Sequence, residues 1–413
     1  MKSDLKSVFG QKDDLHILVF NCGSSSLSYK IFDVVQLKQT RMLAHGKAHR
    51  VGVKGTKASF ITYNFNGRTH KETVPIRTHQ EAAELVFNYI RKNNLKINLV
   101  GHRFVHGGNF FAKSAFIDAD TLKKLRLCLP LAPIHNPIAL SVIYVSKKNL
   151  PETKQYVAFD SAFHSTLPPV AYTYPLPGAI IKKFAYRKYG FHGLSYLDVM
   201  QKTAAWLKTP AGKLKMIICH LGTGGSSVAA IRYGGSVDTS MGYSPLTGLI
   251  MSTRCGDIDP MLTIYLMAAY GYRPDYLLEM LEKKSGLFGL SGFSSDIRDI
   301  IDKKDEKQAK LAFDMYIHRL KEYLGSYLAV LGNIDALVFT DDIGVQNWLV
   351  REKVCENMAW GGILLDKNRN RNASSDKITG LNAAKSKVKI LSVPNDEEQV
   401  ICMEGLRLIG ESA

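Results

Sequence analysis

Apolar and polar residues alternate over short runs near the N-terminus, which is typical of β-strands with one buried face. Five such runs predict five strands, at residues 15–20, 29–34, 41–46, 59–64 and 69–74. The last two are separated by Asn66 and Gly67, and an Asn-Gly pair between strands favours a tight hairpin turn. The chain is therefore expected to open with a meander followed by a hairpin.

The pattern then changes to helical spacing. Apolar residues three and four positions apart predict a helix over residues 80–93. A second helix is expected over residues 120–129, with Thr121 as its N-cap and Pro130 as its stop.

Two further strands, at residues 99–106 and 156–160, complete the first half of the chain. The second of them ends on Asp160, so this carboxylate is expected at the carboxyl edge of the sheet. Open α/β sheets usually bind their ligands at that edge.

The second half repeats this plan. Strands are predicted at residues 216–219, 226–233, 235–238, 334–340 and 388–392. A long helical region covers roughly residues 260–330, a loop is expected at 341–344, and a final helix at 399–409. Similar strand–turn–strand units far apart in one chain indicate a duplicated domain.

Two Gly- and Ser-rich turns occupy matching places in the two halves. The first, residues 21–26, follows the first strand, and the second, residues 220–227, follows the strand at 216–219. Glycines let a backbone approach an anion closely and direct several N–H groups at it. Either turn alone is explained by ordinary chain reversal, but two in the same order indicate phosphate binding.

Together with further motifs, these turns make the chain resemble the acetate, propionate and butyrate kinases. The matching motifs follow the family's order, at residues 21–27, 101–108, 131–137, 159–164, 189–193, 220–260, 285–292, 294–298 and 394–398. The resemblance covers nearly the full length. It implies an α/β fold of two duplicated ribonuclease H-like domains, as in actin, sugar kinases and Hsp70, with an active-site cleft between them.

The expected domain boundaries follow from the resemblance and the strand pattern. An N-terminal actin-like domain would comprise residues 1–160 and be completed by 395–413, and a second actin-like domain with the nucleotide pocket would comprise 161–394. Four prolines between 168 and 177 fit a stiff connection after the crossover. Residues 1–14 lack the apolar core of a secretory signal and are expected to form a frayed extension.

Composition restricts the alternatives. A chain of 413 residues is long enough for two cores, and no apolar run approaches the roughly 20 residues that span a bilayer. Six scattered cysteines without C-x-x-C spacing argue against a metal cluster or disulfide framework and favour a cytoplasmic location.

The net charge of +17 raises the question of nucleic-acid binding. The basic residues are spread along the chain, however, and the densest segment, residues 367–389, lacks interleaved aromatics. That segment is interpreted as a solvated loop, and neither a nucleic-acid nor a membrane partner is expected.

Four residues inside the matching motifs are implied as catalytic. Arg103 would hold the small carboxylate, and Arg254 the equatorial phosphoryl oxygens. His192 would donate to the transferring phosphoryl group, and Asp160 would organise a magnesium ion. A surface ion pair is the commonest place for an arginine, but both arginines lie in motifs beside Gly and His.

The remaining implied positions form three sets. Near the metal are Asn21 and Glu397, with Glu398 as an alternative to Glu397. The apolar acyl pocket would contain Val105, Ile134, Phe191 and Pro245, which core packing would explain equally well. Nucleotide and phosphate binding would involve Ser24, Ser26, His135, His220, Gly222, Gly224, Asp296, Arg298 and Gly344.

Three segments depart from the family pattern. Ser28 stands where the family has Lys, and Lys30 is expected on the opposite face of the strand. The second turn reads Gly-Thr-Gly at residues 222–224 in place of Gly-Asn-Gly. The nucleotide loop has Asp341 and Asp342 in place of Ala and Gly, which puts two negative charges near a triphosphate.

The resemblance therefore implies reversible, direct in-line phosphoryl transfer between ATP, as co-substrate, and acetate, with Mg²⁺ or Mn²⁺ and a homodimeric enzyme. Three alternatives stay open: another short-chain acid kinase, a pyrophosphate-dependent variant, and a catalytically degenerate regulatory homologue. A pocket distinguishes one methylene by only about 1–3 kcal/mol, so apolar residue types do not separate acetate from propionate.

Overall fold

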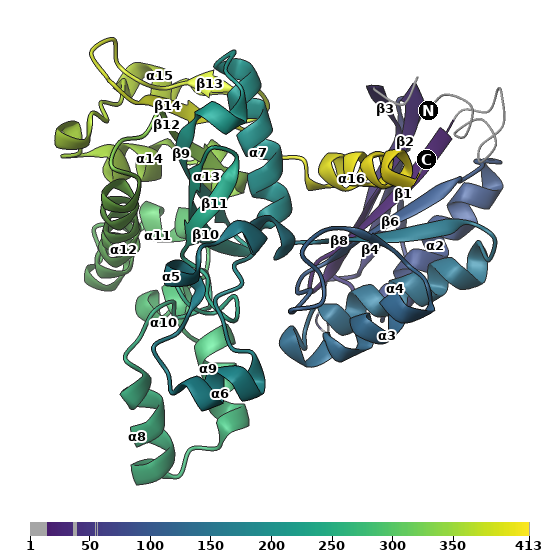
Figure 1. Ribbon diagram of the computed structural model, residues 1–413, viewed down its shortest axis with the longest axis horizontal. Helices are drawn as coiled ribbons and strands as arrows, with labels where there is room; N and C mark the ends of the chain where they lie inside the picture. The colour runs from purple at the N-terminus through teal and green to yellow at the C-terminus, as the bar shows by residue number, and fades with distance from the viewer. Residues whose placement is uncertain (1–14, 36–38, 54, 56, 413) are drawn as a thin grey trace. The chain divides into compact units, whose positions relative to one another are not determined.

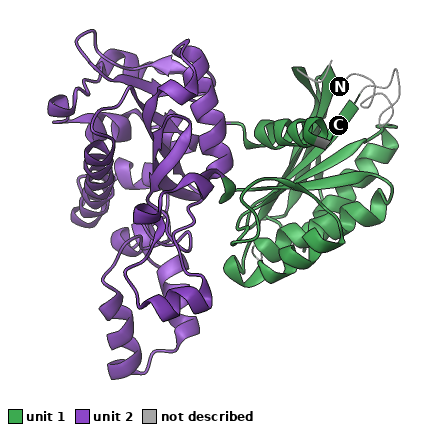
Figure 2. Ribbon diagram, in the orientation of Figure 1, with its two compact units in different colours: residues 1–162, 396–413 green, residues 163–395 purple. Residues whose placement is uncertain are grey.

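The computed structural model describes residues 15–35, 39–53, 55 and 57–412 (Figure 1). The expected extension at residues 1–14 lies outside the described residues. The chain divides into two compact units (Figure 2): unit 1 is Met1–Ala162 with Asp396–Ala413, and unit 2 is Phe163–Asn395.

The core of unit 1 is an eight-stranded sheet in the order β5-β4-β3-β2-β1-β6-β8-β7. The strands are β1 Leu15–Cys22, β2 Ser26–Val35, β3 Gln39–His49, β4 Phe60–Phe65, β5 Arg68–Thr73, β6 Leu99–Phe104, β7 Ala115–Phe116 and β8 Lys154–Phe159. Every strand predicted in this half is present. Asn66 and Gly67 have φ angles of 51° and 72°, as a tight two-residue hairpin turn requires.

Helices cover both faces of this sheet (Figure 1). They are α2 His79–Lys92, α3 Ala119–Leu127, α4 Asn136–Asn149 and α16 Glu397–Ser412, with a 3₁₀ turn at Leu129–Leu131. The predicted apolar stripe of α2 is buried together with α4 against one face, and α16 packs on β1 and β6 from the other.

The predicted N-cap of α3 was wrong. The helix begins at Ala119, and the carboxylate of Asp118 accepts the backbone N–H of Thr121 at 2.7 Å. Thr121 is therefore inside the first turn, and the charged acceptor three residues before it satisfies the N–H that would otherwise lack a partner.

Unit 2 is built on a six-stranded sheet in the order β11-β10-β9-β12-β14-β13. Its strands are β9 Lys215–Gly222, β10 Gly225–Arg232, β11 Gly235–Thr239, β12 Ala336–Thr340, β13 Thr379–Gly380 and β14 Lys389–Ser392. In unit 1, β1 pairs antiparallel with β2 and parallel with β6, and in unit 2, β9 pairs in the same way with β10 and β12. The five-strand orders β3-β2-β1-β6-β8 and β11-β10-β9-β12-β14 therefore correspond, which confirms the predicted duplication.

The predicted helical region near residues 260–330 is present as five helices. The helices of unit 2 are α5 Pro169–Tyr172, α6 Gly178–Phe184, α7 Gly193–Trp206, α8 Pro260–Tyr270, α9 Pro274–Lys283, α10 Gly286–Ser291, α11 Ile297–Asp302, α12 Lys307–Leu331, α13 Asp341–Gln346, α14 Trp348–Cys355 and α15 Lys367–Arg371. Short 3₁₀ turns lie at Ala162–Thr166, Ala211–Lys213 and Ala359–Gly361. One face of the sheet packs with α12 and the other with α7.

Two loop predictions in unit 2 were wrong. Residues 341–344 are not a loop but the start of helix α13, directly after β12. The basic segment 367–389 begins with α15, whose first N–H groups bond to the Asp366 carboxylate, and it contributes β13 to the sheet. Asn370 in α15 is fully buried, and its Oδ1 accepts a hydrogen bond from Arg351 Nε at 2.7 Å.

Among the described residues, no helix has the length and apolar character needed to cross a bilayer. The six cysteines are all free, and five of them are buried. Burial raises the pKa of the Cys22 thiol to about 12, so this residue at the end of β1 is protonated and packs as a small apolar side chain.

Candidate functional site

Polar side chains gather at the carboxyl ends of the parallel strands of unit 1. Asn21 lies at the end of β1, Arg103 near the end of β6, and Asp160 directly after β8. The first turn of α16 adds Glu397 and Glu398. Because β1, β6 and β8 are neighbours and run in parallel, their ends lie at one edge of the sheet.

Arg103 is the centre of this group. Its Nε and Nη2 donate to the two carboxylate oxygens of Asp160 at 2.9 and 2.6 Å. Its Nη1 donates to Asn21 Oδ1 at 3.0 Å and lies 3.3 Å from Glu397 Oε2. Burial opposes the charge of this arginine, but the surrounding carboxylates outweigh it and raise its pKa. The guanidinium is therefore a fixed positive charge in a rigid frame.

The two glutamates of α16 have different partners. Asn21 Nδ2 donates to Glu397 Oε2 at 3.1 Å and to Glu398 Oε1 at 2.9 Å. Glu397 faces Arg103, whereas Glu398 lies 3.4 Å from the Nζ of Lys30. Of the pair, Glu397 is thus the one grouped with Arg103.

The predicted orientation of Lys30 was wrong. Residues two apart in a strand share a face, and along β2 Ser28 and Lys30 are both partly exposed between buried neighbours. Ser28 also lies opposite Asn21 in the register. Lys30 Nζ is 2.7 Å from both carboxylate oxygens of Asp396, so a lysine charge is present on the face where Ser28 lies.

The first Gly/Ser turn closes tightly. The N–H of Gly23 donates to the carbonyl of Ser26 at 2.9 Å, and the Gly23 carbonyl lies 2.9 Å from His79 Nε2. Ser24 is exposed and Ser26 is partly exposed, so both hydroxyls lie at the surface of unit 1.

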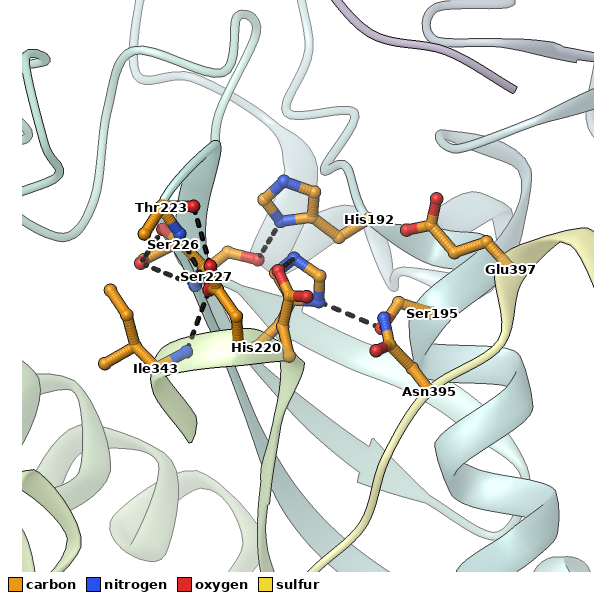
Figure 3. A network of polar contacts seen from close by, with 12 residues as sticks. His192, Ser195, His220, Thr223, Ser226, Ser227, Ile343, Asn395 and Glu397 are labelled. Atoms are coloured by element: carbon orange, nitrogen blue, oxygen red, sulfur yellow. Dashed lines mark hydrogen bonds and ion pairs between the residues drawn. The ribbon is translucent and has the colours of Figure 1, made fainter. Parts of the chain in front are cut away.

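The second turn, between β9 and β10, belongs to a separate polar network in unit 2 (Figure 3). His192 precedes α7 with a left-handed backbone, φ 58°. Its Nδ1 lies 2.8 Å from Ser227 Oγ, which is also 2.5 Å from the hydroxyl of Tyr196. The His192 ring stacks on His220 with centroids 4.0 Å apart. Two imidazoles therefore lie side by side next to the turn.

A chain of hydrogen bonds orients His220 (Figure 3). Asn395 Nδ2 donates to Ser195 Oγ at 3.0 Å, and that hydroxyl lies 2.9 Å from His220 Nδ1. On the other side, His220 Nε2 is 3.1 Å from Asp341 Oδ2. A carboxylate on Nε2 and a hydroxyl on Nδ1 fix the position of this ring.

Asp342 binds the backbone of the turn itself. Its carboxylate accepts the N–H of Thr223 at 2.9 Å, the hydroxyl of Thr223 at 2.7 Å, and the N–H of Ile343 at 2.8 Å. Through these bonds Asp342 links Thr223 in the turn to Ile343 at the start of α13 (Figure 3). The two acidic residues of α13 are therefore fixed against the second turn.

Arg254 is partly buried beside the same turn. Its Nη1 donates to the Pro245 carbonyl at 3.3 Å, and burial lowers its pKa. A Cβ on Gly225 would lie 3.1 Å from that Nη1 and 3.5 Å from His192 Nε2. Absence of a side chain at Gly225 therefore lets the arginine and His192 approach the turn.

Other predicted residues occupy more ordinary places. Asp296 caps α11 by accepting the N–H of Arg298, and the two side chains form a local ion pair. Gly344 is buried in α13, and its carbonyl accepts a hydrogen bond from Arg351 Nη1. A Cβ added to Gly344 would lie 3.7 Å from Leu221 Cβ. This is an ordinary van der Waals distance, so packing of α13 on β9 does not by itself require glycine at this position.

The predicted acyl-pocket residues divide between the units. In unit 1, Val105 is buried and Ile134 is 38% exposed; in unit 2, Phe191 is buried and Pro245 partly exposed. His135 precedes α4 and provides no side-chain cap to it.

Sequence reasoning missed the residues that orient the histidines. Ser195 and Tyr196 come from α7, Ser227 from β10, and Asn395 from the segment after β14. Ser227 and Asn395 lay in motifs that had been singled out, but neither was assigned a role. A prediction of helix α7 immediately after His192 would have indicated Ser195 and Tyr196, in the first turn of that helix.

Comparisons with known proteins agree with this architecture. A family model described as the acetokinase family matches residues 16–403. The chain is 42% identical to an acetate kinase from Caldicellulosiruptor saccharolyticus, over 96% of this chain and 100% of that protein. It is 43% identical to the solved acetate kinase from Entamoeba histolytica, with a TM-score of 0.86 over 95% and 99% of the two chains. A propionate kinase structure from Francisella tularensis is 34% identical, with a TM-score of 0.86 over 94% and 98%.

Proposed function

The chain belongs to the acetokinase family, and we propose that it transfers a phosphoryl group reversibly between ATP and the carboxylate of acetate. The observation that carries the proposal is that each unit holds a set of polar groups at the corresponding place in its sheet. The Arg103–Asp160 pair lies at the strand ends of unit 1, and His192, His220 and Arg254 lie around the turn of unit 2. Phosphoryl transfer needs mainly positioning and charge neutralisation, which these groups provide.

In unit 1, Arg103 is proposed to bind the acetate carboxylate. Its rigid bidentate contact with Asp160 fixes the plane of the guanidinium, and a guanidinium suits a carboxylate partner. Val105 and Ile134, with Phe191 and Pro245 of unit 2, are proposed to contact the methyl group.

The proposed metal is Mg²⁺. Among the residues that the structure describes, no group of three or more His, Cys, Asp or Glu side chains forms a metal cage. Asn21, Asp160 and Glu397 nevertheless supply oxygen atoms at one edge, and Mg²⁺ typically keeps several waters and uses one or two carboxylates with substrate phosphates. The donor set therefore fits a hydrated ion, which would neutralise charge on the transferring phosphates.

In unit 2, His192 is proposed to donate a hydrogen bond to the transferring phosphoryl group through Nε2, because Nδ1 is engaged with Ser227. Arg254, which is partly buried and whose guanidinium lies beside the turn, is proposed to stabilise the equatorial oxygens. Charge-assisted donors of this kind act most strongly where water is excluded. No covalent phosphohistidine is needed, and the transfer is proposed to be direct.

Ser24, Ser26, His135, Gly222 and Gly224 are proposed as phosphate contacts, and Asp296 and Arg298 as the edge of the adenosine pocket. A homodimer in the cytoplasm is proposed from family membership, with small-molecule substrates and neither nucleic-acid nor membrane partners. The second candidate donor is pyrophosphate, because Asp341 and Asp342 replace the Ala and Gly of the family's nucleotide loop.

Trapping of acyl phosphate as a hydroxamate tests the proposal. The full chain is incubated with Mg²⁺, with acetate, propionate or butyrate, and with ATP, GTP or pyrophosphate. We expect product with acetate and ATP. Product only with pyrophosphate would transfer the assignment to that donor, and no product from folded protein with any combination would favour the degenerate homologue.

The Arg103→Ala and Arg254→Ala variants serve within the same assay. Each removes a charge-assisted donor to the reacting groups, so turnover should fall by roughly 10²-fold or more. Replacement of the exposed Arg273, which pairs with Asp275 at the surface, is the matched control and should leave turnover unchanged. Near-wild-type turnover of either active-site variant contradicts its assigned role.

A further inference from the structure

We infer that Asp341 and Asp342 act as a built-in anion on the second turn, so that a phosphate-bearing donor binds there only by displacing them. The inference rests on the proposed function and specifies how its donor site is controlled. Asp341 and Asp342 are thereby specificity-determining residues that weaken binding of nucleoside triphosphates.

The hydrogen-bond donors that would bind a phosphate are already engaged. The N–H and hydroxyl of Thr223 bond to Asp342, at 2.9 and 2.7 Å. His220 Nε2 is 3.1 Å from the carboxylate of Asp341. Backbone N–H, hydroxyl and imidazole groups around one turn are the types of donor that hold a phosphate, and here two carboxylates take them.

Space around the turn is filled in the same way. A Cβ added to Gly222 would lie only 2.0 Å from Asp341 Oδ2. The carboxylate therefore occupies the volume that glycine leaves open beside the backbone. An incoming phosphate oxygen would meet this carboxylate at the place where close approach to the backbone is possible.

The charge of Asp342 also acts on Arg298, which is proposed to lie at the edge of the adenosine pocket. The pKa of Arg298 is raised mainly by its hydrogen bonds to Asp296, and the charge of Asp342 adds to the rise. Because the Arg298 guanidinium is already paired with Asp296, it does not cancel the charge at the turn. Like charges brought together without compensation weaken binding substantially.

The carboxylates are held by their own backbone. Asp341 has a left-handed backbone, φ 64°, which is uncommon for residues other than glycine, asparagine and aspartate. Asp342 bonds the N–H of Ile343 within the first turn of α13. Release of Asp342 therefore breaks its bond to the N–H of Ile343 in the first turn of α13, which adds to the cost of donor binding.

Calorimetric titration of the full chain with Mg·ATP, Mg·ADP and adenosine tests the inference. The variant is Asp341→Asn with Asp342→Asn, because asparagine keeps the size and tolerates the left-handed backbone. It should bind Mg·ATP at least about tenfold more tightly than wild type, equivalent to about 1.4 kcal/mol. Affinity for adenosine should not change, because adenosine carries no phosphate.

A matched control removes two exposed carboxylates from the same unit, in the variant Asp302→Ala with Asp305→Ala. An equal gain in Mg·ATP affinity there would mean a general charge effect and would overturn the inference. Unchanged Mg·ATP affinity in the folded double asparagine variant would overturn it as well. Asp342→Gly, which restores the residue of the family motif, provides a second variant with the same expected gain.

Steady-state kinetics separate this inference from the proposed function. With both correct, the KM for ATP falls and the KM for acetate is unchanged. Tighter Mg·ATP binding without acyl phosphate formation would retain the inference and reject the function. Acyl phosphate formation with unchanged ATP affinity would retain the function and reject the inference.

Discussion

At the scale of single residues, the two units use opposite means to hold their reactive groups. In unit 1, Arg103 is charged because carboxylates surround it. In unit 2, burial outweighs the nearby charge of Glu282 and lowers the pKa of Arg254. A phosphoryl group would therefore stabilise the charged guanidinium of Arg254, since the substrate would add negative charge beside it.

His102 gives a residue-scale prediction about pH. It is buried in β6, its Nε2 donates to Gln155 Oε1 at 2.9 Å, and burial lowers its pKa from 6.5 to about 4. The unfolded chain therefore binds a proton on this residue at higher pH than the folded chain. The stability contribution of neutral His102 is present above about pH 6.5 and is lost as the pH falls toward about 4, by up to about 3 kcal/mol.

Thermal melting between pH 7 and pH 5 measures this effect. We expect His102→Gln to lower the melting temperature at pH 7 but to show a smaller further drop at pH 5 than wild type. Replacement of the exposed His318 by Gln is the control. Identical pH dependence of wild type and His102→Gln would show that His102 does not take up the proton on unfolding.

At the scale of elements, strands were well predicted because each alternates apolar and polar residues or is a short apolar run between turns. Helix α2 was predicted because its apolar residues form one stripe. Helices α4 and α7 were missed, since buried residues lie around most of their circumference and leave no clear polar face.

Site prediction from sequence reached the residues within motifs but not their partners. Arg103 and Asp160, both predicted, contact each other directly. The network around His220 draws on α7, α13 and the segment before α16, and such convergence is a property of the tertiary fold. The start of α13 resembled a loop because consecutive aspartates are common in turns; bonds from Thr223 to Asp342 stabilise the helical start instead.

Helix α16 supplies an element-scale prediction. It packs closely on β8, because a Cβ added to Gly405 would lie 2.6 Å from the Tyr156 ring, and the Tyr156 hydroxyl donates to the Ile401 carbonyl at 2.6 Å. Gly405→Ala should lower the free energy of unfolding of unit 1 by about 1–3 kcal/mol through overpacking.

Gly410→Ala is the matched control in the same helix, because nothing lies within 4 Å of its added Cβ. That change should be neutral or stabilising, since alanine favours helix over glycine. Hydrogen exchange of the β1 and β6 amides gives the readout. Equal protection in the two variants would contradict the close packing of α16.

At the scale of the whole molecule, one strand order appears twice, and each copy presents polar groups at the ends of its parallel strands. The first copy contributes carboxylates and an arginine, and the second contributes imidazoles, an arginine and a Gly-rich turn. The net charge of +17 provides a general field that favours anionic substrates. The two sheets thus share one strand order, but different side chains at the ends of their strands give the chain two different polar sets.

The reverse reaction tests the central claim most directly, because it requires both polar sets and forms a product that is measured without background. The full chain is mixed with acetyl phosphate and Mg·ADP, and ATP is measured by luciferase luminescence. We predict ATP formation by wild type, with roughly 10²-fold or greater loss in both Arg103→Ala and Arg254→Ala. Absence of ATP formation by folded wild type, or undiminished formation by both variants, would contradict the account.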